Sequence, residues 1–313
     1  MDRVSFLASK KIPFVVIYDF EGRCRYVKEL SSNRDVLVKT PIFSDPMPKS
    51  DTVPAILKID PIPYERYKKA FDKVIERIKK GETYLLNLTF PTAIELNGDL
   101  VSIFSRAKAP FKILYKNRFV CFSPERFVKI EGGKIFTYPM KGTIEATEKN
   151  AKEKILADSK EMAEHVMVVD LLRNDLSRVA KSVRVNRFRY IDEIEAGDKR
   201  LLQVSSEISG SLPKNWQNRL GEILASLLPA GSISGTPKIS TIKIIKDTEK
   251  YRRGFFTGIF GVFDGERFDS AVMIRYIEKS QEGFLYKSGG GITIDSDPRL
   301  EYSEMLKKVY IPL

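Results

Sequence analysis

The chain has 313 residues, of which 42% are hydrophobic and 30% are charged, and its formal net charge is +12. This composition is typical of a globular protein with a sizeable core and excludes a disordered chain. No apolar run approaches the roughly 20 residues that cross a bilayer, and no cleavable signal peptide is recognisable, so we expect a cytoplasmic protein without a membrane contact.

The first half of the chain alternates between runs of strands and single helices. Residues 1–60 predict short strands at Phe14–Tyr18 and Arg25–Glu29 and then a proline-rich connection. Helical spacing of apolar residues predicts a helix at Tyr64–Lys80, followed by strands and then a long helix at Ser159–Leu172. The strands expected between these helices are Tyr84–Phe90, Phe111–Lys116, Arg118–Phe122, Phe127–Ile130 and Lys134–Tyr138.

The second half repeats this organisation. The glycine-rich loop Ala230–Gly235 is expected to open a helix with Thr236 as its N-cap and Pro237 in its first turn. Another helix is expected at Asn218–Leu228, and the last helix begins at Asp297. The remaining strands are predicted at Val183–Tyr190, Leu201–Ile208, Phe255–Phe263, Phe268–Glu278 and Gly283–Ser288.

Helices that lie between runs of neighbouring strands indicate the α+β class rather than alternating βαβ units. We therefore expect antiparallel β-sheets packed together with helices on the outside. Residues 1–60 are expected to form a short β-rich segment that packs on a main domain of residues 61–313.

Lys141 is the most informative single residue. It lies in the segment TYPMKGT, between a proline and a Gly-Thr pair, where a strand is expected to turn into a loop. A partly desolvated amine loses its proton more easily and becomes a nucleophile. An ordinary surface lysine near a turn is the alternative that spacing alone favours.

Two pairs of glutamates have the spacing that places both carboxylates on one helix face. They are Glu161 with Glu164 and Glu301 with Glu304, and Lys308 shares the face of the second pair. Two such helices can hold a hard divalent cation such as Mg²⁺, which completes its shell with water and an anionic ligand. Each pair alone is more often a solvated acidic face.

Other residues point to an anionic ligand or to acid catalysis. The loop around Gly235 places backbone N–H groups at a helix N-terminus, and Gly290 with Gly291 allows close backbone approach. Arg275, predicted inside an apolar strand, is either a buried partner for a carboxylate or an outward-facing strand residue. Glu125, which follows Ser-Pro between strands, is either a general acid with a raised pKa or a turn carboxylate.

Composition narrows the chemistry further. A single histidine, His165, and two widely spaced cysteines, Cys24 and Cys121, argue against a zinc site and a disulfide framework. The excess of basic residues admits a nucleic-acid partner. Because these residues are spread along the chain and interleaved with acids, we expect an anionic small substrate and no nucleic acid.

Eight segments, in this order, resemble the chorismate-utilising enzymes, a family that contains anthranilate, isochorismate, salicylate and aminodeoxychorismate synthases. The resemblance covers about residues 61–313. It rests on GETYLLNLTF (81–90), SPERF (123–127), PMKGT (139–143), EMAEHVMVVDLLRNDL (161–176), LPAGSISGTPK (228–238), RRGFFTGIFG (252–261), MIR (273–275) and GGGITIDSDPRLEYSEMLKK (289–308).

The resemblance implies a role for each candidate residue. Lys141 would attack C2 of chorismate while Glu125 protonates the departing C4 hydroxyl, and ammonia would then add at C4 and release the lysine. Mg²⁺ would be held by Glu161, Glu164, Glu301 and Glu304. The substrate carboxylate would be bound by Arg275, Lys308 and the backbone of Gly290 and Gly291, beside a wall formed by Gly235 and Thr236.

Within the family, a lysine in this PMKGT position resembles the aminodeoxychorismate synthases, whereas alanine marks the anthranilate synthases. Gln203 stands where anthranilate synthases usually have a histidine linked to pyruvate elimination. Leu85 replaces the water-activating lysine of salicylate and isochorismate synthases. Phe256 replaces a tyrosine on the substrate carboxylate, and Ile144 replaces an arginine common after Gly-Thr.

The resemblance therefore implies the large subunit of an aminodeoxychorismate synthase in p-aminobenzoate and folate biosynthesis, with anthranilate synthase as the alternative. The N-terminal tryptophan-binding motif of anthranilate synthases is not recognisable, so feedback inhibition by tryptophan is not expected. His165 and the two cysteines cannot form a glutaminase triad. Ammonia is therefore expected from solution or from a separate glutamine amidotransferase subunit.

Overall fold

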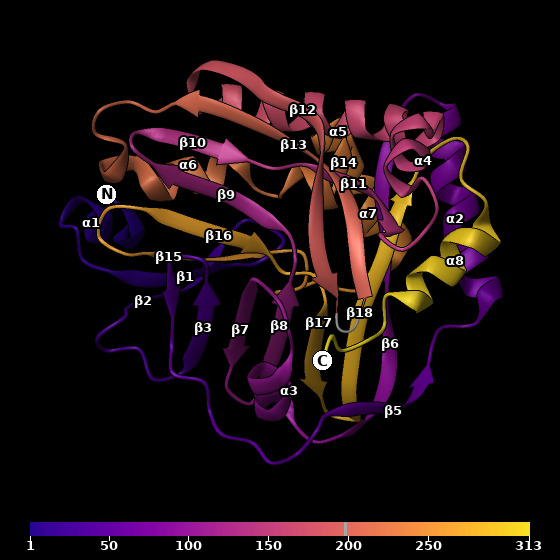
Figure 1. The fold of residues 1–313 in the computed structure, drawn as a ribbon, viewed down its shortest axis with the longest axis horizontal. Coiled ribbons are helices and arrows are strands. Elements are labelled where there is room, and N and C mark those ends of the chain that lie inside the picture. The colour runs from indigo at the N-terminus through magenta and orange to yellow at the C-terminus, as the bar shows by residue number, and fades with distance from the viewer. Residues whose placement is uncertain (197–198) are drawn as a thin grey trace.

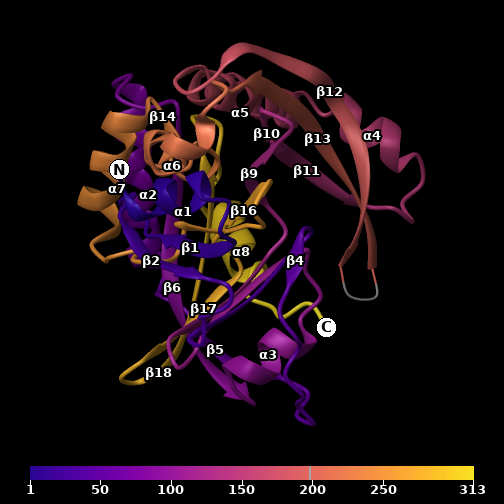
Figure 2. The same ribbon diagram turned by 90° about the vertical axis from the view of Figure 1, so that its left-hand side faces the viewer.

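Two antiparallel β-sheets with helices packed against them make up the fold (Figures 1 and 2). The computed structural model describes residues 1–196 and 199–313, apart from the side chains of residues 159, 160, 195, 196 and 199. The predicted α+β class with antiparallel sheets is confirmed. Strands from residues 1–60 enter both sheets. Two of them, β1 (Phe14–Tyr18) and β2 (Cys24–Glu29), lie at one end of the first sheet, and β3 (Val36–Thr40), β4 (Phe43–Ser44) and β5 (Ala55–Asp60) belong to the second.

The first sheet runs in the order β11-β13-β10-β9-β16-β15-β1-β2, with β12 also paired to β13. In Figure 2, β11, β12 and β13 extend to one side of the molecule beside helix α4. The strands are β1 (Phe14–Tyr18), β2 (Cys24–Glu29), β9 (Arg126–Glu131), β10 (Lys134–Thr137), β11 (Met140–Glu145), β12 (Lys181–Ala196), β13 (Lys199–Ser211), β15 (Ile259–Phe263) and β16 (Phe268–Val272).

The second sheet runs in the order β14-β6-β18-β17-β8-β7-β3-β4, with β5 also paired to β6. The long strands β6 and β18 are neighbours in this sheet, and their pairing brings Gly289–Gly291 opposite Thr89–Asn87. The strands are β3 (Val36–Thr40), β4 (Phe43–Ser44), β5 (Ala55–Asp60), β6 (Leu85–Asn97), β7 (Phe111–Tyr115), β8 (Phe119–Ser123), β14 (Gly235–Thr236), β17 (Tyr276–Ser280) and β18 (Gly283–Ile292).

Helix α8 (Pro298–Lys307) begins where the Asp-Pro pair of the sequence indicates a helix start. Asp297 caps helix α8 by accepting from the backbone N–H groups of Arg299 and Leu300 at 2.8 and 2.9 Å, as its position before a proline predicts. The helices are α1 (Arg3–Ser9), α2 (Tyr64–Lys79), α3 (Leu100–Arg106), α4 (Ala151–Ala157), α5 (Ser159–Ser177), α6 (Leu220–Leu227), α7 (Lys238–Glu249) and α8 (Pro298–Lys307), with 3₁₀ turns η1 (Trp216–Arg219) and η2 (Gly231–Ile233).

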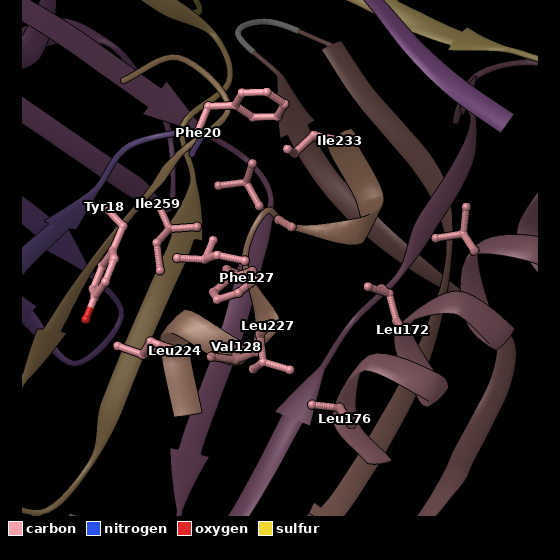
Figure 3. Packing of buried hydrophobic residues seen from close by; sticks show 14 of the residues in the cluster. Tyr18, Phe20, Phe127, Val128, Leu172, Leu176, Leu224, Leu227, Ile233 and Ile259 are labelled. Carbon is pink, nitrogen blue, oxygen red and sulfur yellow. The ribbon is translucent and has the colours of Figure 1, made fainter. Parts of the chain in front are cut away.

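The largest hydrophobic cluster joins both sheets to helices α1, α2, α5, α6, α7 and α8. Figure 3 shows part of it, with Phe127 and Val128 of β9 near Leu224 and Leu227 of α6. Helix α2 presents its predicted apolar stripe to this cluster, since Phe71 and Val74 are buried. Burial of this apolar surface fixes α5 and α8, the two helices that carry the glutamate pairs, against the sheets.

Several predicted elements were wrong in their boundaries. The single strand predicted at Phe268–Glu278 is two strands, β16 and β17, that belong to different sheets. Arg275 lies in their connection with φ of 53°, not inside a strand. Thr236 is not an N-cap but part of β14, and Pro237 precedes helix α7. Lys141 lies within β11, where a loop was expected.

Candidate active site

A cavity of about 540 Å³ gathers residues from both sheets and from helices α5 and α8. Segments far apart in sequence contribute to it because the pairing of β6 with β18 and of β11 with β13 brings them together. Of the twelve predicted site residues, all except Gly235 and Thr236 line this cavity. The ten that do are Glu125, Lys141, Glu161, Glu164, Arg275, Gly290, Gly291, Glu301, Glu304 and Lys308.

The predicted wall at Gly235 and Thr236 is corrected by the structure. Both residues pair with β6, and a Cβ on Gly235 would lie 1.9 Å from the Leu85 carbonyl oxygen. Glycine is needed there for close strand contact, with φ of 132°. The wall is formed instead by Ser232 and Ile233, earlier in the same loop.

The four glutamates lie on one side of the cavity, where α5 and α8 both face it. A methyl group on Gly290 would lie 3.2 Å from Glu301 Oε2 and 3.8 Å from Glu304 Oε1. Two carboxylates therefore converge on one point beside the glycine backbone. Ser296 donates a hydrogen bond of 2.9 Å to Glu301, and Lys308 pairs with Glu304 at 2.6 Å.

This donor set fits magnesium in kind. Mg²⁺ prefers oxygen ligands, binds one or two protein carboxylates and keeps several waters. In the described residues, no three acidic, histidine or cysteine side chains approach one point closely enough to hold a metal ion in the present arrangement. The predicted four-glutamate site therefore stays a prediction, and the Glu301–Glu304 pair beside Gly290 is its best-formed part.

Lys141 points into the cavity and pairs with Glu164, with 2.9 Å between Nζ and Oε2. Burial alone would lower the pKa of this lysine, but Glu164, with smaller contributions from Glu161 and Glu304, outweighs burial and raises it. The expected lowering of the pKa was therefore wrong for this arrangement. Lys141 is partly buried, as expected, and the ion pair reverses the effect of that burial on its pKa.

Glu125 lies between β8 and β9 and accepts a short hydrogen bond from the Ser232 hydroxyl. Burial raises the pKa of this carboxyl, and the Ser232 hydrogen bond, Lys141 and Arg275 oppose the rise only in part. A carboxyl with a raised pKa stays protonated closer to neutral pH and can donate a proton. Ser232 belongs to the segment LPAGSISGTPK, but the sequence did not indicate that its hydroxyl contacts Glu125.

Arg275 offers a half-buried cation to a ligand. Its backbone is in the left-handed region, which costs free energy for a residue with a side chain. Its Nε is buried and has no hydrogen-bond partner in the described part of the chain, while its guanidinium lies over the Tyr310 ring at 5.4 Å. A guanidinium with an open donor can bind an anion such as a carboxylate.

The family profile described as chorismate binding enzyme matches residues 17–313. The chain belongs to this family. An "Uncharacterized PabA-like protein" of Haemophilus influenzae is 46% identical over 319 residues, covering 100% of this chain and 96% of that protein. The fold prediction agrees with the crystal structure of anthranilate synthase component I from Streptococcus pneumoniae, with a TM-score of 0.70 at 24% identity over 83% of this chain and 60% of that one.

Two named enzymes are more distant relatives. Aminodeoxychorismate synthase component 1 of Bacillus subtilis is 32% identical over 266 residues, or 80% of this chain and 55% of that enzyme. Anthranilate synthase component 1 of Aquifex aeolicus is 33% identical over 260 residues, or 78% of this chain and 51% of that enzyme. This chain thus spans about half the length of the named enzymes it matches.

Of the four positions at which the sequence departs from the family pattern, two line the active-site cavity and two do not. Gln203 and Phe256 line the cavity, whereas Leu85 and Ile144 do not. Lys287, which sequence reasoning missed, also lines it, and its ammonium pairs with Glu278 at 2.7 Å. A lysine two residues before the glycine triplet was the available signal.

Across the described residues, every helix is too short or too polar to cross a membrane.

Proposed function

We propose that this chorismate binding enzyme aminates chorismate at C4, as an aminodeoxychorismate synthase component I. The observation that carries the proposal is the presence of Lys141 and Glu125 in one cavity, Lys141 on strand β11 and Glu125 in the connection between β8 and β9. A covalent nucleophile and a proton donor are the two groups that a two-step replacement of a ring hydroxyl by ammonia uses. Gln203, a neutral amide in the same cavity, supports retention of the enolpyruvyl group.

The proposed reaction balances over two displacements. The Lys141 amine forms a bond to C2, the ring double bond shifts, and the C4 hydroxyl leaves as water with the proton from Glu125. Ammonia then bonds to C4, the double bond returns, and the lysine leaves C2. Arg275, whose Nε is unsatisfied and which lines the cavity, would bind a carboxylate of the substrate.

Lys141 must lose its proton before it can attack, and Glu164 holds that proton in the arrangement described here. Magnesium, when bound by Glu161, Glu164, Glu301 and Glu304, would neutralise and orient a substrate carboxylate. Lys308 donates to the Gly289 carbonyl at 2.9 Å, so it keeps the glycine strand and helix α8 in register beside that site.

A separate glutamine amidotransferase subunit is the proposed source of ammonia, in keeping with the names of the two relatives that are called component 1. The chain alone should use ammonium but not glutamine. Addition of a purified glutaminase subunit should make glutamine a substrate, which a coupled glutamate assay would measure. Glutamine-dependent turnover by the chain alone would remove the need for a partner.

The deciding experiment is mass spectrometry of the product formed from chorismate, ammonium and Mg²⁺. We expect 4-amino-4-deoxychorismate without pyruvate, and loss of this product in Lys141→Ala. Lys134→Ala, on an exposed strand position, is the matched control and should keep activity. A chorismate-derived mass adduct on Lys141 would show the covalent intermediate directly.

Anthranilate synthase is the second candidate, because a named anthranilate synthase is as similar in sequence as the named aminodeoxychorismate synthase. Fluorescent anthranilate together with pyruvate would establish it in place of C4 amination.

Unchanged activity in EDTA, or in Glu161→Gln and Glu304→Gln, would remove the magnesium requirement. Exposed Glu266→Gln is the control for those two variants.

A further inference from the structure

A second cavity, of about 350 Å³, lies on the surface and shares no lining residue with the active-site cavity. It forms where the end of β1, the turn between β7 and β8, and the segment after helix α7 meet. We call it the arginine pocket, after the four arginines that line it together with two carboxylates: Arg23, Arg25, Arg118, Arg252, Asp19 and Glu21.

Two of these arginines are neutralised within the pocket. Asp19, only 3% exposed, accepts from Arg23 Nε at 3.0 Å and also from Arg25. Arg23 pairs in addition with Glu21 at 3.0 Å. Four guanidinium groups and two carboxylates leave a net charge of +2 in the pocket.

The other two arginines, Arg118 and Arg252, supply that excess charge. Among the described residues, neither has a carboxylate within ion-pair distance. The Arg118 guanidinium lies over the rings of Tyr115 and Phe255, at 4.8 and 5.1 Å from their centroids. Stacking holds the plane of this guanidinium in place, so less side-chain entropy is lost when it binds an anion.

The segment that carries Arg252 also builds the active-site cavity. Phe255 lines the arginine pocket, and Phe256, the next residue, lines the active-site cavity. Arg253, which follows Arg252 in the sequence, is buried and donates to the carbonyls of Asn87 and Ile233. Both of these residues line the active-site cavity. A ligand that fixes Arg252 therefore acts on a backbone segment shared by both cavities.

We propose that the arginine pocket binds a small dianion, a phosphate or a dicarboxylate, and that its occupancy changes the affinity of the active site for its substrate. The net charge of the pocket matches two negative charges, and the guanidinium fork matches both phosphate and carboxylate oxygens. A concave surface pocket of about 350 Å³ with a pre-arranged Arg118 favours a small molecule over an acidic protein surface.

The binding test uses isothermal titration calorimetry of the full chain with inorganic phosphate and, separately, with phthalate, at constant ionic strength. Saturable binding of inorganic phosphate alone identifies a phosphate ligand, and of phthalate alone a dicarboxylate. Arg118→Gln and Arg252→Gln should each weaken binding about tenfold, because each removes a charge-assisted contact. Arg219→Gln, an exposed arginine elsewhere, should bind as the wild type does.

Binding that survives both pocket variants but is lost in Arg275→Gln would place the anion in the active-site cavity and overturn the proposal. Absence of saturable binding by either probe would overturn it as well, and binding of only an acidic protein would replace the small ligand. These arms need no turnover, so they are independent of the proposed reaction. The coupling is then measured as a change in KM for chorismate with saturating probe, which Arg252→Gln should abolish.

Discussion

Glu249→Gln tests the buried ion pair that supports the wall of the active-site cavity. Glu249 and Arg253 are each 1% exposed and pair at 2.6 Å, and Glu249 also accepts from the backbone N–H and hydroxyl of Thr89, both at 2.9 Å. Arg253 in turn donates to the carbonyls of Ile233 and Asn87 at 3.0 and 2.6 Å. The pair therefore joins helix α7 and the segment after it to β6 and the loop that carries Ser232.

Glutamine keeps the shape of Glu249 but leaves the Arg253 charge buried without its counter-ion, and its amide donor faces the guanidinium. Removal of one partner of a buried pair costs about 3–5 kcal/mol. That is a large part of the about 5–15 kcal/mol by which a folded domain is stable. Because Ile233 and Asn87 line the cavity, we also expect a lower kcat/KM in any variant molecules that remain folded.

Urea unfolding followed by far-UV circular dichroism measures the effect as a shift of the midpoint at unchanged slope. Glu222→Gln is the matched control, because Glu222 pairs with Arg219 on the surface, where the two side chains are 60% and 62% exposed. Such a surface pair contributes about 0–1 kcal/mol. Equal midpoints for the two variants would refute the reasoning that burial makes this pair essential.

Three further predictions follow from particular contacts. Ser232→Ala should raise the pKa of Glu125 further, because the Ser232 hydrogen bond opposes the effect of burial. The alkaline limb of the pH profile of kcat should therefore move to higher pH in Ser232→Ala. Ser232→Thr, which keeps the hydroxyl, should leave that limb where it is in the wild type. Gly290→Ala should weaken activation by Mg²⁺ with the fold intact, whereas Gly289→Ala, whose Cβ would lie 2.2 Å from the Leu88 carbonyl oxygen, should lower the unfolding midpoint. Burial and the nearby Lys39 lower the pKa of Lys112 to about 8, so between that pH and its unfolded value the native state binds fewer protons. The stability of the wild type relative to Lys112→Met should therefore rise with pH across this interval, by up to about 3 kcal/mol, and a flat difference would contradict the assignment.

Much of the fold could be predicted because hydrophobic spacing is a local property. The strand Phe14–Tyr18 was placed with its observed ends, and Asp297 caps α8 as predicted. Short helices such as α3 were missed, since seven residues give too few apolar positions to show a period. The break near Arg275 was missed for a different reason: the residues on both sides are apolar because each strand is buried in its own sheet.

The candidate site was predicted better as a set of residues than as an arrangement. Ten predicted positions line one cavity, but the exchange of Gly235 and Thr236 for Ser232 and Ile233 depends on how β14 pairs with β6. Lys287 could not be assigned from spacing, because its place in the cavity depends on the pairing of β17 with β18. These are long-range pairings, which a local sequence pattern does not encode.

The pKa of Lys141 shows where reasoning from sequence ends. The chain partly buries this lysine, and burial acts to lower its pKa, but Glu164 on α5 reverses the direction of the shift. The same glutamate is a predicted ligand of Mg²⁺. A carboxylate that neutralises a metal ion holds the proton of a neighbouring ammonium less strongly, so the two predicted roles cannot be independent. Glu164→Gln should therefore affect the protonation of Lys141 as well as the requirement for Mg²⁺, and a variant that changed only one of the two would separate the nucleophile from the metal site.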